Sequence, residues 1–134
     1  MIFVDSNVPM YVAGRDHANK APAIRLLRRI REGELEACTS AEVLQEILHR
    51  YHGMGRADLA RDVYELFVQV CTNVLPVTLA DTDRALELKA QGLGVSVRDA
   101  VHAAVMLNHE IRLIATFDRG FDAVPGIERV GLIR

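Results

Sequence analysis

The sequence has no long hydrophobic run, few aromatic residues and no tryptophan. Its first apolar residues end at Asp5, which leaves no room for the apolar segment of a signal peptide. The other apolar runs are too short to span a membrane. We therefore expect a cytoplasmic protein. Because aromatic residues make up only 5% of the chain, aliphatic side chains must form most of its core.

Cysteine motifs and a strong net charge are also missing. Cys38 and Cys71 stand far apart, outside any CxxC pair or zinc-type Cys/His cluster, so we expect buried free thiols. A formal net charge of -2 argues against a protein that coats nucleic acid with a basic surface. It does not exclude a nuclease, because a bound cation supplies positive charge locally. Lysine provides only two of the 16 basic residues, and the arginines that dominate suit bidentate contacts with phosphates.

What is present fits one compact domain covering residues 1–134. Half of the residues are hydrophobic, a quarter are charged, and no repeat or linker divides the chain. Short apolar runs typical of strands alternate with amphipathic segments typical of helices. This alternation predicts an α/β fold, with a mainly parallel central sheet of four or five short strands flanked by helices. The expected strands are 1–4, 35–38, 74–77, 112–116 and 127–130, and the expected helices are 7–13, 21–30, 42–51, 58–70, 79–91 and 97–108. Ser40 and Ser96 are the expected N-caps of the helices at 42–51 and 97–108, and Pro76 places the strand at 74–77 near an edge of the sheet.

Two of the expected strands end in an acidic residue. Asp5 follows the first strand, and Asp118 follows the strand at 112–116. Since parallel strands end at the same edge of a sheet, both carboxylates are expected on one rim, where sites in such folds lie. Either acid alone has a simpler explanation as the cap of a following helix.

Two further acids are placed by their helices. Asp99 opens a helix whose other inward positions are alanine and valine, and an unpaired carboxylate beside such a surface is costly. Glu42 and Glu46 are four residues apart and share one helix face. We favour Glu46 as the functional acid because it adjoins the apolar Ile47, although Glu42 stays open. For Asp99 and Glu42 the alternative is a first-turn residue that interacts with the helix dipole.

Four carboxylates on one rim would repel one another unless cations held them. Oxygen ligands of this kind suit Mg²⁺ or Mn²⁺ better than Zn²⁺. Such ions promote phosphodiester hydrolysis by activating water and neutralising the developing charge. His102, one turn after Asp99, is interpreted as a packing or hydrogen-bonding histidine. The sequence thus predicts a divalent-metal site formed by four acids, namely Asp5, Glu46, Asp99 and Asp118.

Three stretches of the chain resemble the motifs of the PIN domain family. FVDSNVPMY has an apolar strand, an Asp, a small residue and an Asn, and TSAEVLQEILHR has a Ser followed six residues later by a Glu. SVRDAVHAAVMLNHEIRLIATFDRGFDAV has an Asp before an alanine-rich helix and then a Thr-Phe-Asp sequence. These motifs keep their order and spacing over essentially the whole chain.

The resemblance implies a PIN-like three-layer sandwich and a metal-dependent endoribonuclease, a hydrolase that is very often the toxin of a VapBC-type toxin–antitoxin system. The implied partners are an RNA substrate, a VapB-like antitoxin and a second copy of the chain in a homodimer. The acidic cluster also suits a guanidinium, so we expect the antitoxin to place an arginine near Asp5 and Asp99. Which RNA is cleaved, and whether one or two Mg²⁺ or Mn²⁺ ions bind, stays open.

The resemblance also implies roles for individual residues. Asp5 and Asp99 match the principal metal ligands, and Glu46 and Asp118 match the acids that complete the catalytic cluster. Asn7, Thr116 and Asp122 match positions that support the site, and the role of Asp122 stays open.

Three other function classes are alternatives for this pattern of acids. A phosphoacceptor receiver domain needs a pair of acids after the first strand and a lysine after a late strand, but Ser6 and Asn7 follow Asp5, and no lysine follows Lys89. A phosphatase with an aspartate nucleophile needs a second Asp where this chain has Asn7. A non-catalytic binding module, in which the acids serve only as caps, is the third alternative.

Overall fold

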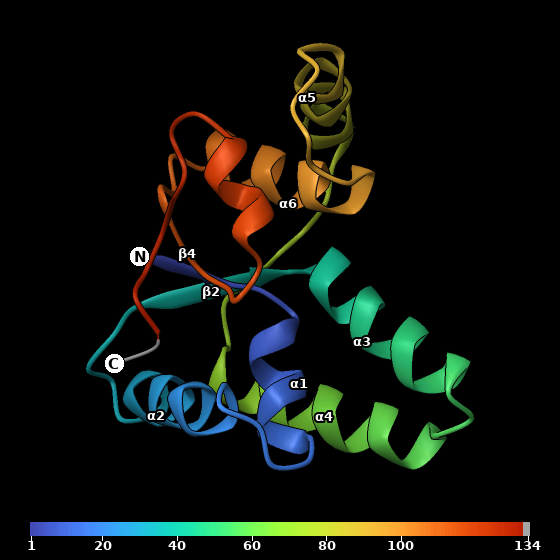
Figure 1. Cartoon of the computed structure of the whole chain (residues 1–134), viewed down its shortest axis with the longest axis vertical. Coiled ribbons are helices and arrows are strands. Elements are labelled where there is room, and N and C mark those ends of the chain that lie inside the picture. The colour runs from blue at the N-terminus through green and yellow to red at the C-terminus, as the bar shows by residue number, and fades with distance from the viewer. Residues whose placement is uncertain (133–134) are drawn as a thin grey trace.

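A five-stranded parallel sheet lies at the centre of the structure, a computed structural model that describes residues 1–132 (Figure 1). The strand order is β3-β2-β1-β4-β5, and every neighbouring pair is parallel. The expected α/β architecture is confirmed, and the sheet has five short strands, within the expected four or five. The strands are β1 Ile2–Val4, β2 Ala37–Ser40, β3 Val74–Leu75, β4 Leu113–Ala115 and β5 Glu128–Arg129.

Helices cover the sheet on both faces. In Figure 1, α1, α2 and α4 lie below the sheet, while α6 lies above it with α5 packed on its far side. Within residues 1–132, no helix combines the length and the apolar character needed to cross a membrane. The helices are α1 Asn7–Ala13, α2 Lys20–Arg31, α3 Ala41–Gly53, α4 Ala57–Val70, α5 Leu79–Ala90 and α6 Val97–Asn108, and a 3-10 helix, η1, spans Arg119–Ala123.

Side-chain caps define where the two helices nearest the site begin. The Ser40 hydroxyl accepts a hydrogen bond from the Val43 amide at the start of α3, and Ser96 accepts one from the Asp99 amide at the start of α6. Both caps were predicted from the sequence. Because each cap sets the residue at which its helix begins, it also sets the helix face from which Glu46 or Asp99 projects.

The register of the central strands brings their carboxyl ends together. Val4 of β1 pairs with Ala115 of β4, and the Asp5 amide donates to the Ala115 carbonyl at 3.1 Å, one residue beyond the strand. On the other side, the Thr39 hydroxyl of β2 donates to the Val4 carbonyl at 2.9 Å. Asp5 and Thr116 therefore leave the sheet side by side, directly after strands that are buried in the core.

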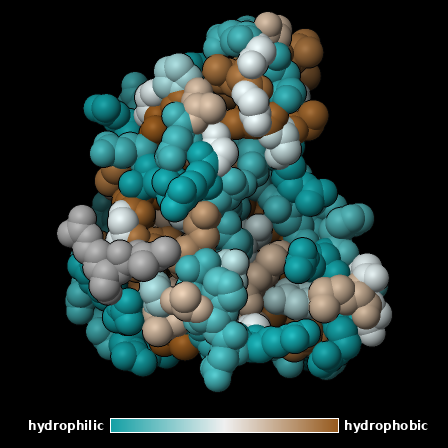
Figure 2. Space-filling view, in the orientation of Figure 1, coloured by the Kyte–Doolittle hydropathy of each residue, from teal (hydrophilic) through white to brown (hydrophobic). Residues whose placement is uncertain are grey.

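Most large apolar side chains are buried, but a few stay on the surface above the sheet. Leu79 and Leu86 of α5 are 76% and 72% exposed, and Val97 at the start of α6 is 67% exposed. Figure 2 shows hydrophobic surface at the top of the molecule, over α5. This surface lies on helices α5 and α6, which pack against each other.

Candidate active site

Asp5 lies at the rim of the sheet with its carboxylate held from three sides. Thr116 Oγ1 donates to Asp5 Oδ2 at 2.8 Å, Asn7 Nδ2 approaches the same oxygen at 3.4 Å, and the Ser6 amide donates to Oδ1 at 2.7 Å. Asn7 also donates to Thr116 Oγ1 at 3.0 Å. Because Asp5 is only 4% exposed, these bonds determine its orientation. Asn7 and Thr116 therefore lie beside Asp5 and contact its Oδ2 atom.

Asp99 and Asp118 meet beside Asp5, although they come from α6 and from the loop after β4. Their carboxyl groups lie close enough for one of them, when protonated, to donate a hydrogen bond to the other. Burial, this hydrogen bond and the negative charges of Asp5 and Asp118 raise the pKa of Asp99 to about 7. Asp118 also caps η1, since its Oδ1 accepts from the Gly120 amide at 2.8 Å. The three aspartates thus share one electrostatic environment.

Glu46 reaches the same rim from α3. Its Oε2 accepts a hydrogen bond from Ser6 Oγ at 3.1 Å, and its Oε1 contacts Nε2 of His102. Glu42, the alternative acid, lies 3.6 Å from the Arg98 guanidinium at the edge of the site. The structure thus joins Glu46 to the acidic cluster and pairs Glu42 with Arg98.

His102 lies closer to the acidic residues than its position in the sequence indicates. Its side chain is fully buried, and Nε2 lies 3.9 Å from Asp5 Oδ1 in addition to its contact with Glu46. The sequence predicts a packing or hydrogen-bonding histidine at this position, and the structure identifies Glu46 as its partner. The available signal was spacing, because residues three apart on a helix share a face and His102 lies three positions after Asp99.

Burial and charge act against each other in this cluster. Burial raises the pKa of Asp5 and the Glu46 carboxylate adds to the effect, while His102 and the hydrogen bonds from Thr116 and Ser6 oppose it. Burial alone would lower the pKa of His102, but the hydrogen bond with Glu46 and the nearby carboxylates raise it above its usual value. A divalent cation would relieve this concentration of negative charge.

The residues that could hold such a cation fall into two groups that share Asp5. Ligand atoms of Asp5, Glu46 and His102 lie within 4.8 Å of one another. Asp99, which the resemblance pairs with Asp5 as a metal ligand, interacts with Asp5 and is hydrogen-bonded to Asp118. All four predicted acids therefore converge on one rim.

Asp122 has a different partner. Its two carboxylate oxygens accept hydrogen bonds from Nε and Nη2 of Arg129, at 2.8 and 2.9 Å. These hydrogen bonds lower the pKa of Asp122. We therefore assign Asp122 to holding η1 against β5, a structural contact that the family motif did not indicate.

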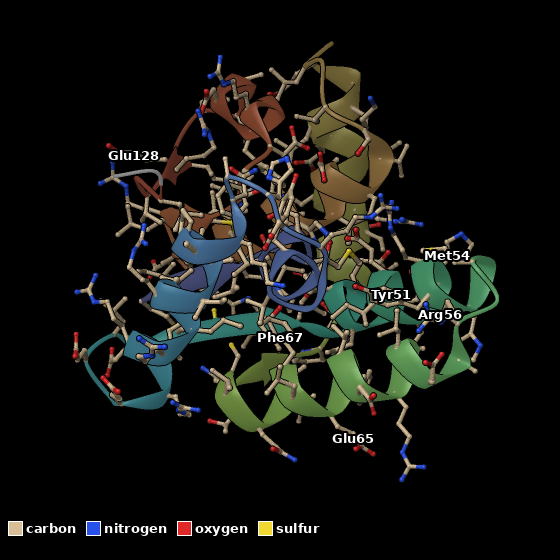
Figure 3. All side chains as sticks on the ribbon, turned by 60° about the horizontal axis from the view of Figure 1, so that its bottom comes forward. Tyr51, Met54, Arg56, Glu65, Phe67 and Glu128 are labelled. Atoms are coloured by element: carbon tan, nitrogen blue, oxygen red, sulfur yellow. The ribbon has the colours of Figure 1, made fainter. Side chains whose placement is uncertain are left out.

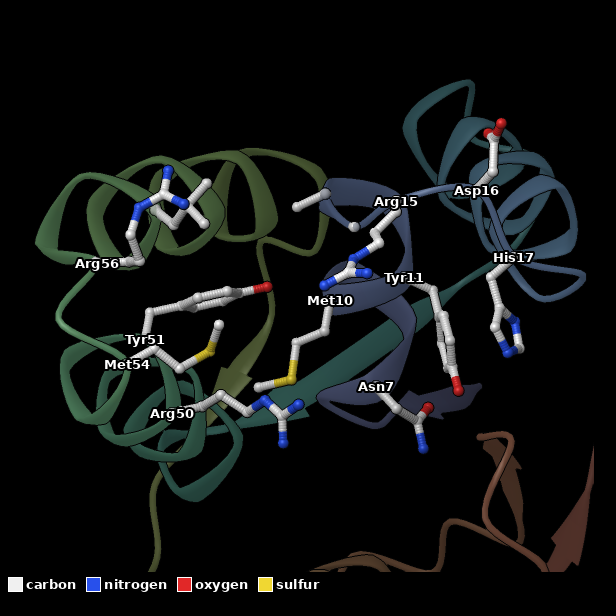
Figure 4. Close-up of a pocket in the computed structure, with 13 residues that line it drawn as sticks. Asn7, Met10, Tyr11, Arg15, Asp16, His17, Arg50, Tyr51, Met54 and Arg56 are labelled. Carbon is white, nitrogen blue, oxygen red and sulfur yellow. The ribbon is translucent and has the colours of Figure 1, made fainter.

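A groove runs from the site along α1 towards the junction of α3 and α4. It has a volume of about 710 Å³ and shares Asn7 with the acidic rim. Figure 3 locates Tyr51, Met54 and Arg56 at the α3–α4 junction, and Figure 4 shows Met10 of α1 beside Tyr51 and Met54. The groove therefore combines an apolar wall with cationic side chains, which are Arg15, Arg50 and Arg56.

The raised pKa of Asp99 predicts a pH-dependent effect of Asp99→Asn. The folded chain keeps a proton on Asp99 up to about pH 7, whereas the unfolded chain releases it near 3.8. The free energy of unfolding of the metal-free protein therefore falls as pH rises between these values. Asp99→Asn is expected to raise the melting temperature by a few degrees at pH 8, with a smaller gain at pH 5.

Thermal melts of chelator-treated protein at both pH values measure this effect. Asp83→Asn, at an exposed position of α5, is the matched control and should change little. An equal gain for Asp99→Asn at pH 8 and pH 5 would contradict the assignment of the raised pKa.

The model of the PIN domain family matches residues 2–127 of the chain. The chain is 42% identical over 130 residues to Ribonuclease VapC13 of Mycobacterium tuberculosis, covering 97% of this chain and 99% of the relative. It is 38% identical over 118 residues to Ribonuclease VapC23 of the same species, covering 88% of this chain and 93% of the relative.

Solved structures share the fold. The crystal structure of M. tuberculosis VapC20, described as a Sarcin-Ricin loop cleaving toxin, matches with a TM-score of 0.75 and 24% identity over 92% of this chain and 94% of that one. A chain of a toxin–antitoxin complex from Klebsiella pneumoniae matches with a TM-score of 0.67 and 18% identity, over 98% of both chains. At these identities the likeness concerns the fold, which agrees with the three-layer arrangement described above.

Proposed function

The chain belongs to the PIN domain family as a VapC-type ribonuclease, and we propose that it hydrolyses RNA phosphodiester bonds with Mg²⁺ or Mn²⁺ held by the acidic cluster. In this proposal residues 1–134 form a single PIN domain. The observation that carries it is the meeting of Asp5, Asp99, Asp118 and Glu46 on one rim. The receiver-domain alternative is set aside, because the motifs and the relatives point to a nuclease.

The donor set fits a hard divalent cation. Asp5 and Asp99 supply carboxylate oxygens, the ligands that Mg²⁺ and Mn²⁺ prefer. Burial raises the pKa of Asp99 to about 7, with smaller contributions from Asp118 and Asp5, and a bound cation would offset this cost of ionisation. When bound, the ion activates water and neutralises charge that develops on the phosphate.

The chain's own residues orient these ligands. In our proposal Asp5 and Asp99 hold the ion, and Glu46 and Asp118 complete the cluster. Thr116 and Asn7 fix the Oδ2 atom of Asp5 by hydrogen bonds, so this carboxylate needs little rearrangement to bind a cation. Such preorganisation strengthens cation binding most in a partly buried site, because water screens the charges less there.

Removing the metal is expected to abolish RNA cleavage. The purified protein should not cut a single-stranded RNA in the presence of EDTA, and excess Mg²⁺ or Mn²⁺ should restore activity. Without RNA, metal at about 100 times its Kd should stabilise the folded chain by about 2.7 kcal/mol. Gel assays and thermal melts measure the two effects. Cleavage that persists in EDTA, after repeated chromatography to remove contaminating nucleases, would overturn the proposal.

An antitoxin is the proposed protein partner. A chain with this fold occurs in a solved toxin–antitoxin complex, and the groove along α1 leads to the acidic rim. We propose that an apolar antitoxin segment packs on Met10, Tyr51 and Met54 and places an arginine near Asp5 and Asp99. That arginine would oppose metal binding through its charge and its position. An antitoxin with this arginine replaced by alanine should inhibit cleavage less, and unchanged inhibition would contradict the idea.

A homodimer is proposed as the assembly, because two-fold dimers are the commonest oligomers. The apolar-rich helical segments 8–13 and 58–70 are candidate surfaces from the sequence, but Val8 is buried in α1 and Phe67 in α4. The exposed leucines of α5, Leu79 and Leu86, are the better candidates. Sedimentation that shows only monomer at micromolar concentration would remove this claim and leave the nuclease proposal intact.

A further inference from the structure

His102 sits under the acidic cluster, where it joins two elements of the site. It lies on α6, one turn after Asp99, and its side chain is fully buried. Its ring packs against Phe3 of β1, with centroids 5.8 Å apart. From this position Nε2 contacts Oε1 of Glu46, a residue of α3 that lies 56 positions earlier in the chain. His102 therefore connects α6 to the acid that α3 contributes.

Glu46 depends on such contacts for its orientation. Its side chain has several rotatable bonds and projects from α3, whereas Asp5 follows a strand and is held by short hydrogen bonds. His102 contacts Oε1, and Ser6 Oγ donates to Oε2 at 3.1 Å. Arg98 is more distant, at 3.9 Å, and is 43% exposed. The buried contact with His102 is thus the one best shielded from water.

In the charged form of His102 both ring nitrogens carry a hydrogen, so Nε2 is a donor; in the neutral form the other nitrogen, Nδ1, indicates which atom carries the hydrogen. Nδ1 is buried and has no hydrogen-bond partner within residues 1–132. If Nε2 carried no hydrogen, the hydrogen would sit on Nδ1 as a buried donor without an acceptor, and Nε2 would face a Glu46 oxygen as a second acceptor. A hydrogen on Nε2 avoids placing two acceptors face to face, because Nε2 then donates to the Glu46 oxygen. Buried donors without a partner are rarer than buried acceptors without one.

The same argument weighs against His102 as a direct metal ligand. Coordination through Nε2 would force the hydrogen onto Nδ1, and histidine ligands almost always donate that hydrogen to a carboxylate, a carbonyl or water. Among the described residues, no carboxylate or carbonyl oxygen accepts a hydrogen bond from Nδ1 of His102. The geometry therefore favours donation to Glu46.

We propose that His102 is a positioning residue that donates its Nε2 hydrogen to Glu46 and holds this carboxylate beside Asp5, ready for a metal ion. The proposal rests on the function proposed above, and it adds a residue that acts through Glu46. Partners that orient metal-site carboxylates typically change metal affinity by about 10- to 100-fold when they are lost. His102 is expected to fall in this range.

Two amide substitutions distinguish positioning from packing. A glutamine side chain places its amide nitrogen near the position of Nε2, whereas asparagine reaches only to the position of Nδ1. His102→Gln should therefore keep the hydrogen bond to Glu46, and His102→Asn should lose it. His102→Leu fills the space without any donor. Circular dichroism and thermal melts establish that each variant is folded before it is compared.

The principal measurement is Mn²⁺ binding by calorimetry in the absence of RNA, followed by RNA cleavage. His102→Gln should stay within about threefold of the wild type in Mn²⁺ affinity, while His102→Asn and His102→Leu should lose about tenfold or more. In a Glu46→Gln background, His102→Asn should cost little further, because the acid it positions is gone. Equal affinities for all three His102 variants and the wild type would overturn the proposal, as would a loss in His102→Gln as large as in His102→Leu.

A spectroscopic test does not depend on nuclease activity. Nitrogen-15 NMR of the histidine rings should show a hydrogen on Nε2 of His102 that is coupled to the presence of Glu46. An Nε2 without hydrogen would overturn the proposal even in a protein that cleaves RNA. The protein could also show the expected ring signal but bind no metal and cleave no RNA. In that case the hydrogen bond would stand, while its role in a metal site and the proposed nuclease function would both be rejected.

Discussion

Replacing Asp5 by asparagine is expected to lower RNA cleavage by about 100- to 1,000-fold, the loss typical when one preorganised electrostatic group is removed from an active site. Asparagine keeps the shape of the side chain, but it removes the negative charge that the cation needs. Asp5 is central to the cluster, since it interacts with Asp99, Glu46 and His102. Its loss therefore affects every proposed ligand at once.

The folded state should survive this change. Burial and the Glu46 carboxylate raise the pKa of Asp5, so a neutral residue relieves repulsion in the metal-free chain. Initial rates on a labelled single-stranded RNA, with thermal melts alongside, separate activity from stability. Asp122→Asn is the matched control, because the Asp122 carboxylate pairs with Arg129. Wild-type rates for Asp5→Asn would contradict the mechanism, and an equal loss for Asp122→Asn would show that the effect is not specific to the cluster.

Local signals in the sequence were enough for most of the fold. Ser40 and Ser96 were recognisable as helix caps, and both cap their helices in the structure. Pro76 indicated an edge strand, and β3 is indeed at the edge of the sheet, ending at Leu75. Strand β2 begins and ends two residues later than predicted, because its limits follow from pairing with β1 and β3 and not from its own hydrophobic pattern. The 3-10 helix η1 had no such local pattern.

The positions of the acids at strand ends were predictable from the sequence, but the partners of His102 and Asp122 were not. Asp5 and Asp118 follow parallel strands, so topology alone brings them to one rim. His102 has its partner, Glu46, on another helix, and no local pattern reveals such a contact. Asp122 matched a family position that is sometimes acidic, yet Arg129 of β5 binds its carboxylate. In both cases the partner is set by tertiary packing, which spacing along one helix does not describe.

Changing Met54 to glutamate is expected to weaken binding of the antitoxin by about 30-fold or more, the effect of losing a 2 kcal/mol interface contact. Met54 lies directly after α3, is 57% exposed and lines the groove beside Met10 and Tyr51. A buried charge on this wall would face an apolar antitoxin segment without a partner and would be costly to desolvate. Since Met54 is exposed in the free chain, the substitution should leave the fold largely unaffected.

The measurement is the affinity of the proposed VapB-like antitoxin, by calorimetry, together with RNA cleavage with and without that antitoxin. Leu48→Glu is the matched control, because Leu48 is a partly exposed apolar residue of α3 outside the groove. Met54→Glu should cleave RNA at nearly the wild-type rate alone and should need a correspondingly higher antitoxin concentration for inhibition. If Leu48→Glu weakened binding as much as Met54→Glu, the antitoxin would use a different surface. If both variants bound normally, the apolar wall would contribute little, and the acidic rim would have to supply the affinity through charge, with a steep dependence on salt.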